Sequence, residues 1–277
     1  MNIKTVLVVG LCLTTLVVLE AAQSTNIPQA LGAQRVSVTL TETVANGWVP
    51  PTTWKLLYDG PVVEHEISFD IATPEWKLLK STRLGMWIQN PLDRSDLFFP
   101  PGGEVDYLLG LTGPKVKGVQ TSFEVRFIDA GSPAGKAVWT FGDNDLLRLR
   151  TRLTYPVVFD TGRHTIIPAL IWYHVEPIEY RPKVSGDTIC FQTSYEWKPK
   201  PWLKLGANAG FLHDEGVGGS ISADVVSYGG MAGVRLMSKA PECWLNGYIQ
   251  QYNTFGSPQN RPTKDFTIFS ASLSVKF

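Results

Sequence analysis

The last twelve residues, 266–277, read FTIFSASLSVKF and decide the fold. Apolar side chains alternate there with small or charged polar ones. The apolar face carries Phe269, Ala271, Leu273, Val275 and Phe277. The polar face carries Ser270, Ser272, Ser274 and Lys276. A period of two residues is typical of a β-strand with one apolar and one polar side. The chain therefore ends in a strand that separates an apolar surrounding from a polar one.

The same alternation recurs upstream through most of the chain. Residues 147–155, for example, place leucines and a tyrosine opposite three arginines and a threonine. We predict twelve strands, at about 35–45, 61–71, 78–90, 103–113, 118–130, 144–159, 164–177, 187–198, 202–213, 223–237, 243–254 and 265–277. Pro168 removes a ladder donor and predicts a bulge or kink in the seventh strand.

The connections between these strands alternate in length. Long connections follow the odd strands, as at 46–60 and 91–102, and short ones follow the even strands, as at 114–117 and 199–201. An even strand number with short turns at one end and long loops at the other is typical of an outer-membrane β-barrel. We therefore predict an all-β fold, a single antiparallel transmembrane β-barrel spanning residues 35–277. A soluble periplasmic β-protein is the alternative.

The N-terminus predicts the compartment. Residues 1–24 combine Lys4, an apolar run from Val6 to Leu19 and small residues at Ala22 and Ser24, the layout of a cleaved secretory signal peptide. Residues 25–34 would then form an N-terminal periplasmic segment. Cys190 and Cys243 fall near opposite ends of the strand map, so we expect two unpaired thiols.

Composition narrows the function classes. The 25 basic residues balance the 25 acidic ones, which gives no reason to expect a nucleic-acid partner. Aromatic residues reach 11% and gather near the short turns, as an interfacial girdle would. They are Trp76, Tyr155, Phe159, Tyr195, Trp197, Trp202, Trp244 and Phe277.

The terminal strand resembles the C-terminal assembly signal of bacterial outer-membrane proteins, which ends in an aromatic residue such as Phe277. The segment GGEVDYLLGLTG at 102–113 is similar to small porins of Gram-negative bacteria. The resemblance implies export, insertion into the outer membrane, and outer-membrane lipid and the assembly machinery as partners.

If the apolar faces meet lipid, the opposite faces line the lumen. The acidic candidates for this lining are Glu64, Glu66, Asp70, Glu104, Asp106 and Glu124. The basic candidates are Arg126, Arg148, Arg150 and Arg152, with Arg83 less secure. Such walls can place a transverse field across a pore, or they can neutralise one another in a salt-bridge network. Four glycines, Gly206, Gly210, Gly229 and Gly233, favour some open space, although relief of crowding where the sheet bends explains them equally well.

The predicted function is an outer-membrane porin for passive diffusion of small hydrophilic or charged solutes, which needs no cofactor. A closed structural or adhesive barrel acting through loops 46–60 and 91–102 is the alternative. A lipid hydrolase is a third possibility, because His174 shares a strand face with Glu176. No nucleophile can be assigned to that pair, and the four histidines are too scattered for a metal site, so we predict no enzyme activity.

Overall fold

A computed structural model describes residues 36–54, 56, 59–73, 77–92, 104–130, 145–178, 185–217, 223–237, 241–255 and 265–277. The predicted signal peptide and the segment 25–34 lie outside these residues. The strands are β1 (Val36–Ala45), β2 (Val62–Ala72), β3 (Ser81–Pro91), β4 (Glu104–Val116), β5 (Val119–Ala130), β6 (Leu146–Thr154), β7 (Val157–Phe159), β8 (His164–Pro177), β9 (Gly186–Lys200), β10 (Leu203–Asp214), β11 (Ala223–Arg235), β12 (Glu242–Phe255) and β13 (Phe266–Lys276).

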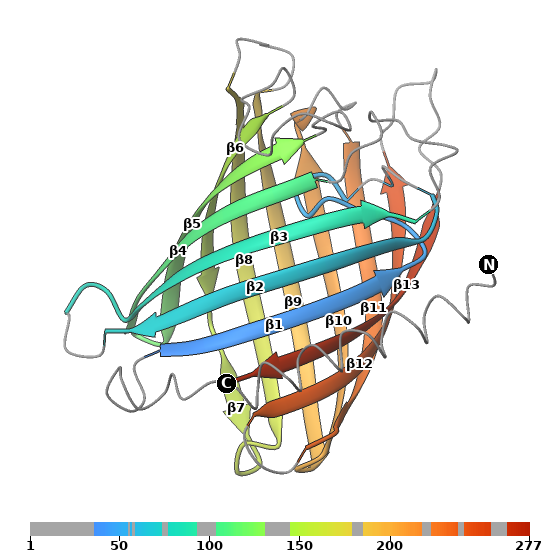
Figure 1. Cartoon of the computed structure of the whole chain (residues 1–277). Coiled ribbons are helices and arrows are strands. Elements are labelled where there is room, and N and C mark those ends of the chain that lie inside the picture. The colour runs from blue at the N-terminus through green and yellow to red at the C-terminus, as the bar shows by residue number, and fades with distance from the viewer. Residues whose placement is uncertain are drawn as a thin grey trace.

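The thirteen strands form one antiparallel sheet that closes on itself (Figure 1). The first strand, β1, pairs with both β2 and β13, and β6 pairs with both β5 and β8. The short β7 continues the line of β6, so the wall is a twelve-strand barrel. Closure leaves no sheet edge, which is the condition for a β-structure to cross hydrocarbon. The predicted fold class and strand number are confirmed.

A break in the wall separates β6 from β7. Pro156 cannot donate a ladder hydrogen bond, and neither can Pro168 on the facing strand β8. The Tyr155 amide still donates to the Pro168 carbonyl at 3.1 Å. The pairing of β8 with β9 passes Pro168 without a register shift. The predicted bulge in β8 is therefore wrong, because the missing donors interrupt the neighbouring strand instead.

The two faces of the strands differ as the alternation predicts. Ser68, Asp106 and Ser272 point inward and are at most 5% exposed. Phe191 and Phe269 point outward and are 57% and 55% exposed. An apolar outer surface is what lipid requires, whereas polar groups are retained inside the barrel. No helix among the described residues is long and apolar enough to span a membrane.

Short turns close one end of the barrel, where β7 lies in Figure 1. The tightest, Lys117–Gly118, has φ of 49° and 86° at its two residues. Positive φ at both central positions is the geometry that matches the twist of a hairpin. Because Gly118 has no side chain, the Tyr155 ring can lie against it; a β-carbon there would be 2.5 Å from the ring.

Outward aromatic residues gather at this end, as the predicted girdle requires. Phe159, His164 and Trp197 stack there, and the His164 Nδ1 lies 2.7 Å from the Tyr195 hydroxyl. Trp244 is the exception, because it shares the inward parity of Asn246 and the Lys204 ammonium lies 4.5 Å from its ring centroid. Trp76 lies outside the described residues.

Cys190 and Cys243 are both free, as predicted. Cys190 points inward from β9 and is fully buried, whereas Cys243 belongs to the outward face of β12 with Leu273 and Val275. The barrel wall separates the two thiols, so no disulfide can join them.

Candidate functional site

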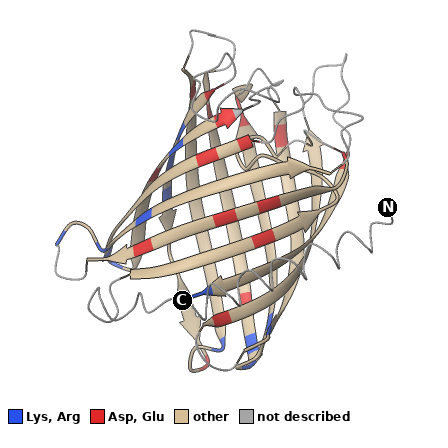
Figure 2. Cartoon of the chain, in the orientation of Figure 1, with Lys and Arg blue, Asp and Glu red and all other residues tan. Residues whose placement is uncertain are grey.

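The charged residues predicted to line the lumen all share the inward face of strands β2 to β6. Figure 2 shows acidic residues at several heights along the front strands of the barrel. Three of these charged side chains are buried in the wall: Asp106 is 1% exposed, Glu124 4% and Arg148 4%. Buried charges are stable only when they are paired.

One carboxylate, that of Glu124 on β5, is shared by three arginines. Its oxygens lie 3.3 Å from Nε of Arg126, 3.6 Å from Nη2 of Arg148 and 2.5 Å from Nη2 of Arg150. The cross-strand register explains this, because Glu124 stands directly opposite Arg150 and Arg126 directly opposite Arg148. We call this group, with Asp106 and Glu104, the central network.

The central network balances its own charge. Arg126 also reaches Asp106 on β4, with Nη1 2.9 Å from Oδ2. Glu104 lies two residues before Asp106 on the same face of β4. Counted as formal charges, three carboxylates face three guanidinium groups, so this part of the wall contributes little of the predicted field.

A second ion-pair cluster joins β2 and β3. The Arg83 Nη2 lies 2.7 Å from Glu66 and donates to the Ser68 hydroxyl at 2.9 Å, while its Nε lies 3.9 Å from Asp70. This confirms the inward position of Arg83. The cluster carries two carboxylates against one guanidinium group, so it retains a net negative charge.

Two predicted residues belong to neither cluster. Arg152 on β6 has no ion pair within 4 Å among the described residues, and its Nε has no hydrogen-bond partner there. Glu64 on β2 accepts a hydrogen bond from the Trp87 side chain rather than from a cation. The three arginines of β6 are therefore not equivalent, although the sequence presents them as one row.

The opposite part of the inner wall is apolar, which the sequence analysis missed. Ala169, Ile171 and Tyr173 of β8 point inward together with Cys190, Leu212 and Val225 of the next three strands. The signal was present in β8, where residues 166–173 are apolar at both parities. A strand apolar on both faces is buried on both faces, so something must cover this wall from inside.

The cover is the first half of the loop after β1, residues 46–54, which we call the inner loop. Its Trp54 is 5% exposed and packs on the apolar wall, with its ring in an edge contact to Tyr252 at 6.3 Å between centroids. Its Trp48 stacks on Trp87 of β3 at 6.5 Å. Asn46 fixes the start of the loop to β13, because its Oδ1 accepts the Phe269 amide at 2.8 Å.

Trp54 holds an unusual backbone conformation. Its φ is +50°, in the left-handed region, and its amide donates to the Pro50 carbonyl at 3.0 Å. That conformation costs about 1–2 kcal/mol in a residue with a β-carbon. Burying a tryptophan removes roughly 150–250 Å² from water, which at about 25 cal/mol per Å² offsets this cost several-fold. The packing of the indole therefore determines the shape of the inner loop.

The four glycines predicted to leave space do face the lumen, but side chains fill the space beside them. A β-carbon on Gly210 would be 2.7 Å from the Trp54 ring, and one on Gly206 would be 2.9 Å from Met231. Gly229 lies against Gln250, and Gly233 against Lys204 and Asn246. Of the two interpretations of these glycines, open space is wrong and relief of crowding agrees with the structure, because the absent side chains make room for neighbouring atoms.

The histidines point outward and form pairs with carboxylates. His65 lies 3.7 Å from Glu42, and His213 lies 2.7 Å from Asp224. The predicted His174–Glu176 pair is present at 3.5 Å, and Nδ1 of His174 lies 3.0 Å from Asp187. Both ring nitrogens of His174 thus face carboxylates, and neither contacts a serine or cysteine among the described residues. In that same part of the chain, no group of His, Cys, Asp and Glu can hold a metal ion.

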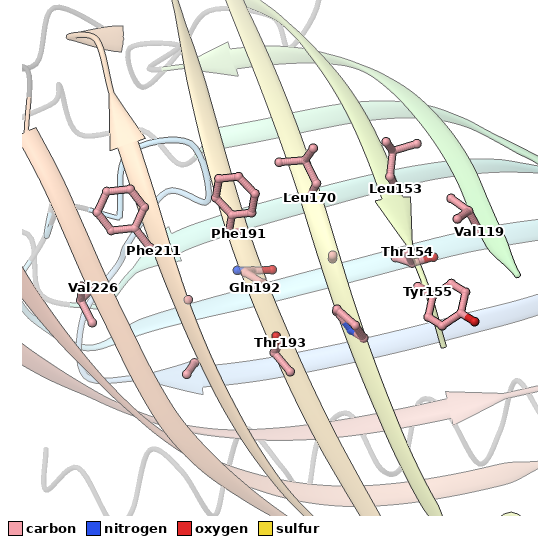
Figure 3. A pocket seen from close by; sticks show the side chains of 14 residues that line it. Val119, Leu153, Thr154, Tyr155, Leu170, Phe191, Gln192, Thr193, Phe211 and Val226 are labelled. Atoms are coloured by element: carbon pink, nitrogen blue, oxygen red, sulfur yellow. The ribbon is translucent and has the colours of Figure 1, made fainter. Parts of the chain in front are cut away.

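A hollow of about 660 Å³ lies on the outer face of β5, β6 and β8 to β11 (Figure 3). Phe191 and Phe211 border it, and the outward side chains between them are small, including Thr193 and Ala209. Because its walls are the exposed apolar residues of the outer surface, the hollow is suited to lipid chains and not to a hydrophilic solute.

Two solved structures share this architecture. One is an outer membrane channel from Pseudomonas putida F1, with a TM-score of 0.53, 8% identity, and coverage of 92% of this chain and 99% of that one. The other is the NanC porin, with a TM-score of 0.50, 6% identity, and coverage of 87% and 100%. No family model and no curated protein sequence matches the chain. The fold is that of these bacterial outer-membrane channels, which confirms the predicted fold class.

Proposed function

We propose that the protein is an outer-membrane porin through which small hydrophilic or charged solutes diffuse passively, without a cofactor. The observation that carries the proposal is a closed twelve-strand wall with an apolar outer face and a charged inner face. A charged inner wall suits a lumen that holds water or an ionic solute. One solved structure with a similar fold is named a porin, the NanC porin, which supports the same functional class.

The proposed selectivity residues are those of the charged wall. We expect the residues without an ion pair to affect selectivity more than the ion-paired ones. The central network, with Arg126, Arg148 and Arg150, is internally balanced. Arg152, which has no ion pair among the described residues, offers its guanidinium group to an anionic solute, since Arg suits paired contacts with carboxylates. For cations, the corresponding groups are Glu64 and the ion-pair cluster around Arg83, which has a net negative charge.

A closed structural barrel is the second candidate. The balanced ion pairs and the inner loop both take up space inside a barrel that is narrower than the sixteen-strand porins. Loop 91–102, which this alternative also invokes, lies outside the described residues except for Pro91 and Leu92.

Planar-bilayer recording of the folded protein under a salt gradient separates the two candidates. Discrete conductance steps are expected for the porin, and the sign of the reversal potential reports its charge preference. A silent bilayer, with folding verified by heat-modifiable gel mobility, would favour the closed barrel.

A charge-reversal variant then tests the selectivity residues. Replacing Arg150→Glu and Arg152→Glu should move the reversal potential towards cation preference. Lys115→Glu is the matched control, because Lys115 is exposed near the turn after β4 and lies outside the charged wall. An unchanged potential in the double variant would remove these arginines from the conducting path.

A further inference from the structure

We propose that the inner loop is the constriction of the lumen and that Trp54 locks it to the barrel wall by inserting over Gly210. This inference rests on the proposed porin function and names the segment that sets the size of the passage. It concerns residues 46–54, all of which are described.

The contact that holds the loop places the large Trp54 ring over Gly210, which has no side chain. The Trp54 ring lies where a β-carbon on Gly210 would be 2.7 Å away, so only glycine leaves the slot open. Inward side chains of four consecutive strands surround the ring, including Ile171, Cys190 and Leu212. The indole is 5% exposed, as in a protein core, although it belongs to a loop between strands.

Two further contacts and the burial of two threonines hold the rest of the loop in place. Asn46 is bonded to β13, where its Nδ2 donates to the Thr267 carbonyl at 3.3 Å. Trp48 stacks on Trp87 of β3. Thr52 and Thr53 are each 7% exposed, so the turn before Trp54 is enclosed as well. The loop thus has contacts to β3 on one side and to β8–β11 on the other.

This placement defines the route for a solute. The loop covers the apolar wall, which leaves the charged wall of β2 to β6 as the polar surface beside the passage. Pore diameter and lining together determine conduction. Releasing the loop should therefore widen the passage and expose the apolar wall behind it.

Cys190 supplies an independent reporter, since it lies behind Trp54 and is fully buried. The test uses Trp54→Ala in a background where Cys12 and Cys243 are replaced by serine. We expect single-channel conductance to rise roughly two-fold or more, because a wider pore conducts more ions. We also expect Cys190 to change from protected to fully labelled by a charged, water-soluble thiosulfonate.

Two variants control this result. Trp202→Ala removes the same side chain from an exposed turn at the other end of the barrel and should change neither reading. Trp54→Phe keeps a ring in the slot, so Cys190 should stay protected and conductance should rise less. If Trp54→Ala fails to fold, the Trp54→Phe variant still tests the role of the ring.

The outcomes are distinct. If the parent conducts and Trp54→Ala has the same conductance, the inner loop is not the constriction and the inference is overturned, whereas the porin function stands. A conductance rise with Cys190 still protected also overturns it, because the lock is then elsewhere. A silent parent with a conducting Trp54→Ala supports the constriction and contradicts an open porin. Silence in both folded proteins contradicts both.

Discussion

The carboxylate of Glu124 on β5 lies 2.5 Å from the guanidinium group of Arg150 on β6, directly opposite it in the sheet register. The same carboxylate also lies within 4 Å of Arg126 and Arg148. A single acidic side chain therefore holds three cationic ones at the centre of the charged wall.

Removing that carboxylate should destabilise the barrel. Glu124→Gln leaves buried guanidinium groups without a counter-charge, and breaking a buried pair of this kind costs about 3–5 kcal/mol. We expect a clear drop in the temperature at which the folded band is lost on a gel, and a shift of the reversal potential towards anion preference. Asp70→Asn is the control, since Asp70 is 39% exposed and lies 3.9 Å from Arg83. Equal stability of the two variants would contradict the central role of Glu124.

The arginines of β6 should separate in a single-substitution series. Arg152→Gln should reduce anion preference without loss of stability, because Arg152 has no ion pair among the described residues. Arg148→Gln should instead lower stability, since Arg148 is 4% exposed and its guanidinium lies 5.9 Å from the Tyr173 ring centroid. Reversal potentials and unfolding temperatures measured on both variants check this. If the two variants had similar reversal potentials and unfolding temperatures, ion pairing would not distinguish the roles of Arg148 and Arg152.

Two glycines in short turns at the β7 end of the barrel form a matched pair. Gly118 and Gly162 both have positive φ, of 86° and 87°. Alanine at either should cost about 1–2 kcal/mol from the backbone alone. Only Gly118→Ala also meets the Tyr155 ring, whereas nothing lies within 4 Å of a β-carbon at Gly162. Urea unfolding in lipid vesicles should show the larger loss for Gly118→Ala. When Gly118→Ala is combined with Tyr155→Ala, the additional loss of stability relative to Gly162→Ala should disappear.

The terminal residue should affect assembly more than stability. Phe277 follows β13 and exchanges backbone hydrogen bonds with Val38 of β1, at 2.9 Å and 3.4 Å. These bonds do not depend on the side chain, so Phe277→Ala should refold normally in detergent. If the aromatic end is the assembly signal, the amount in the outer membrane of cells should fall severalfold. Normal cellular levels of Phe277→Ala would remove it from that role.

The sequence by itself determined the class of the fold. Alternation in segments such as 266–277 predicted both the strands and their two faces, because a strand between lipid and water must alternate. The inward position of Glu124 and Arg150 followed from the same parity. The turn at Lys117–Gly118 also lay within about two residues of its expected place, since hairpin turns have their own local chemistry.

Only the tertiary structure decided what those inward residues do. The pairing of Glu124 with three arginines depends on cross-strand register, and register is a relation between segments far apart in the chain. The insertion of Trp54 over Gly210 joins residues from the first loop and the tenth strand. Glycine at 210 is equally compatible with open space and with a neighbour's ring when read alone. Alternation states which way a side chain points, but what it meets there depends on how the whole sheet closes.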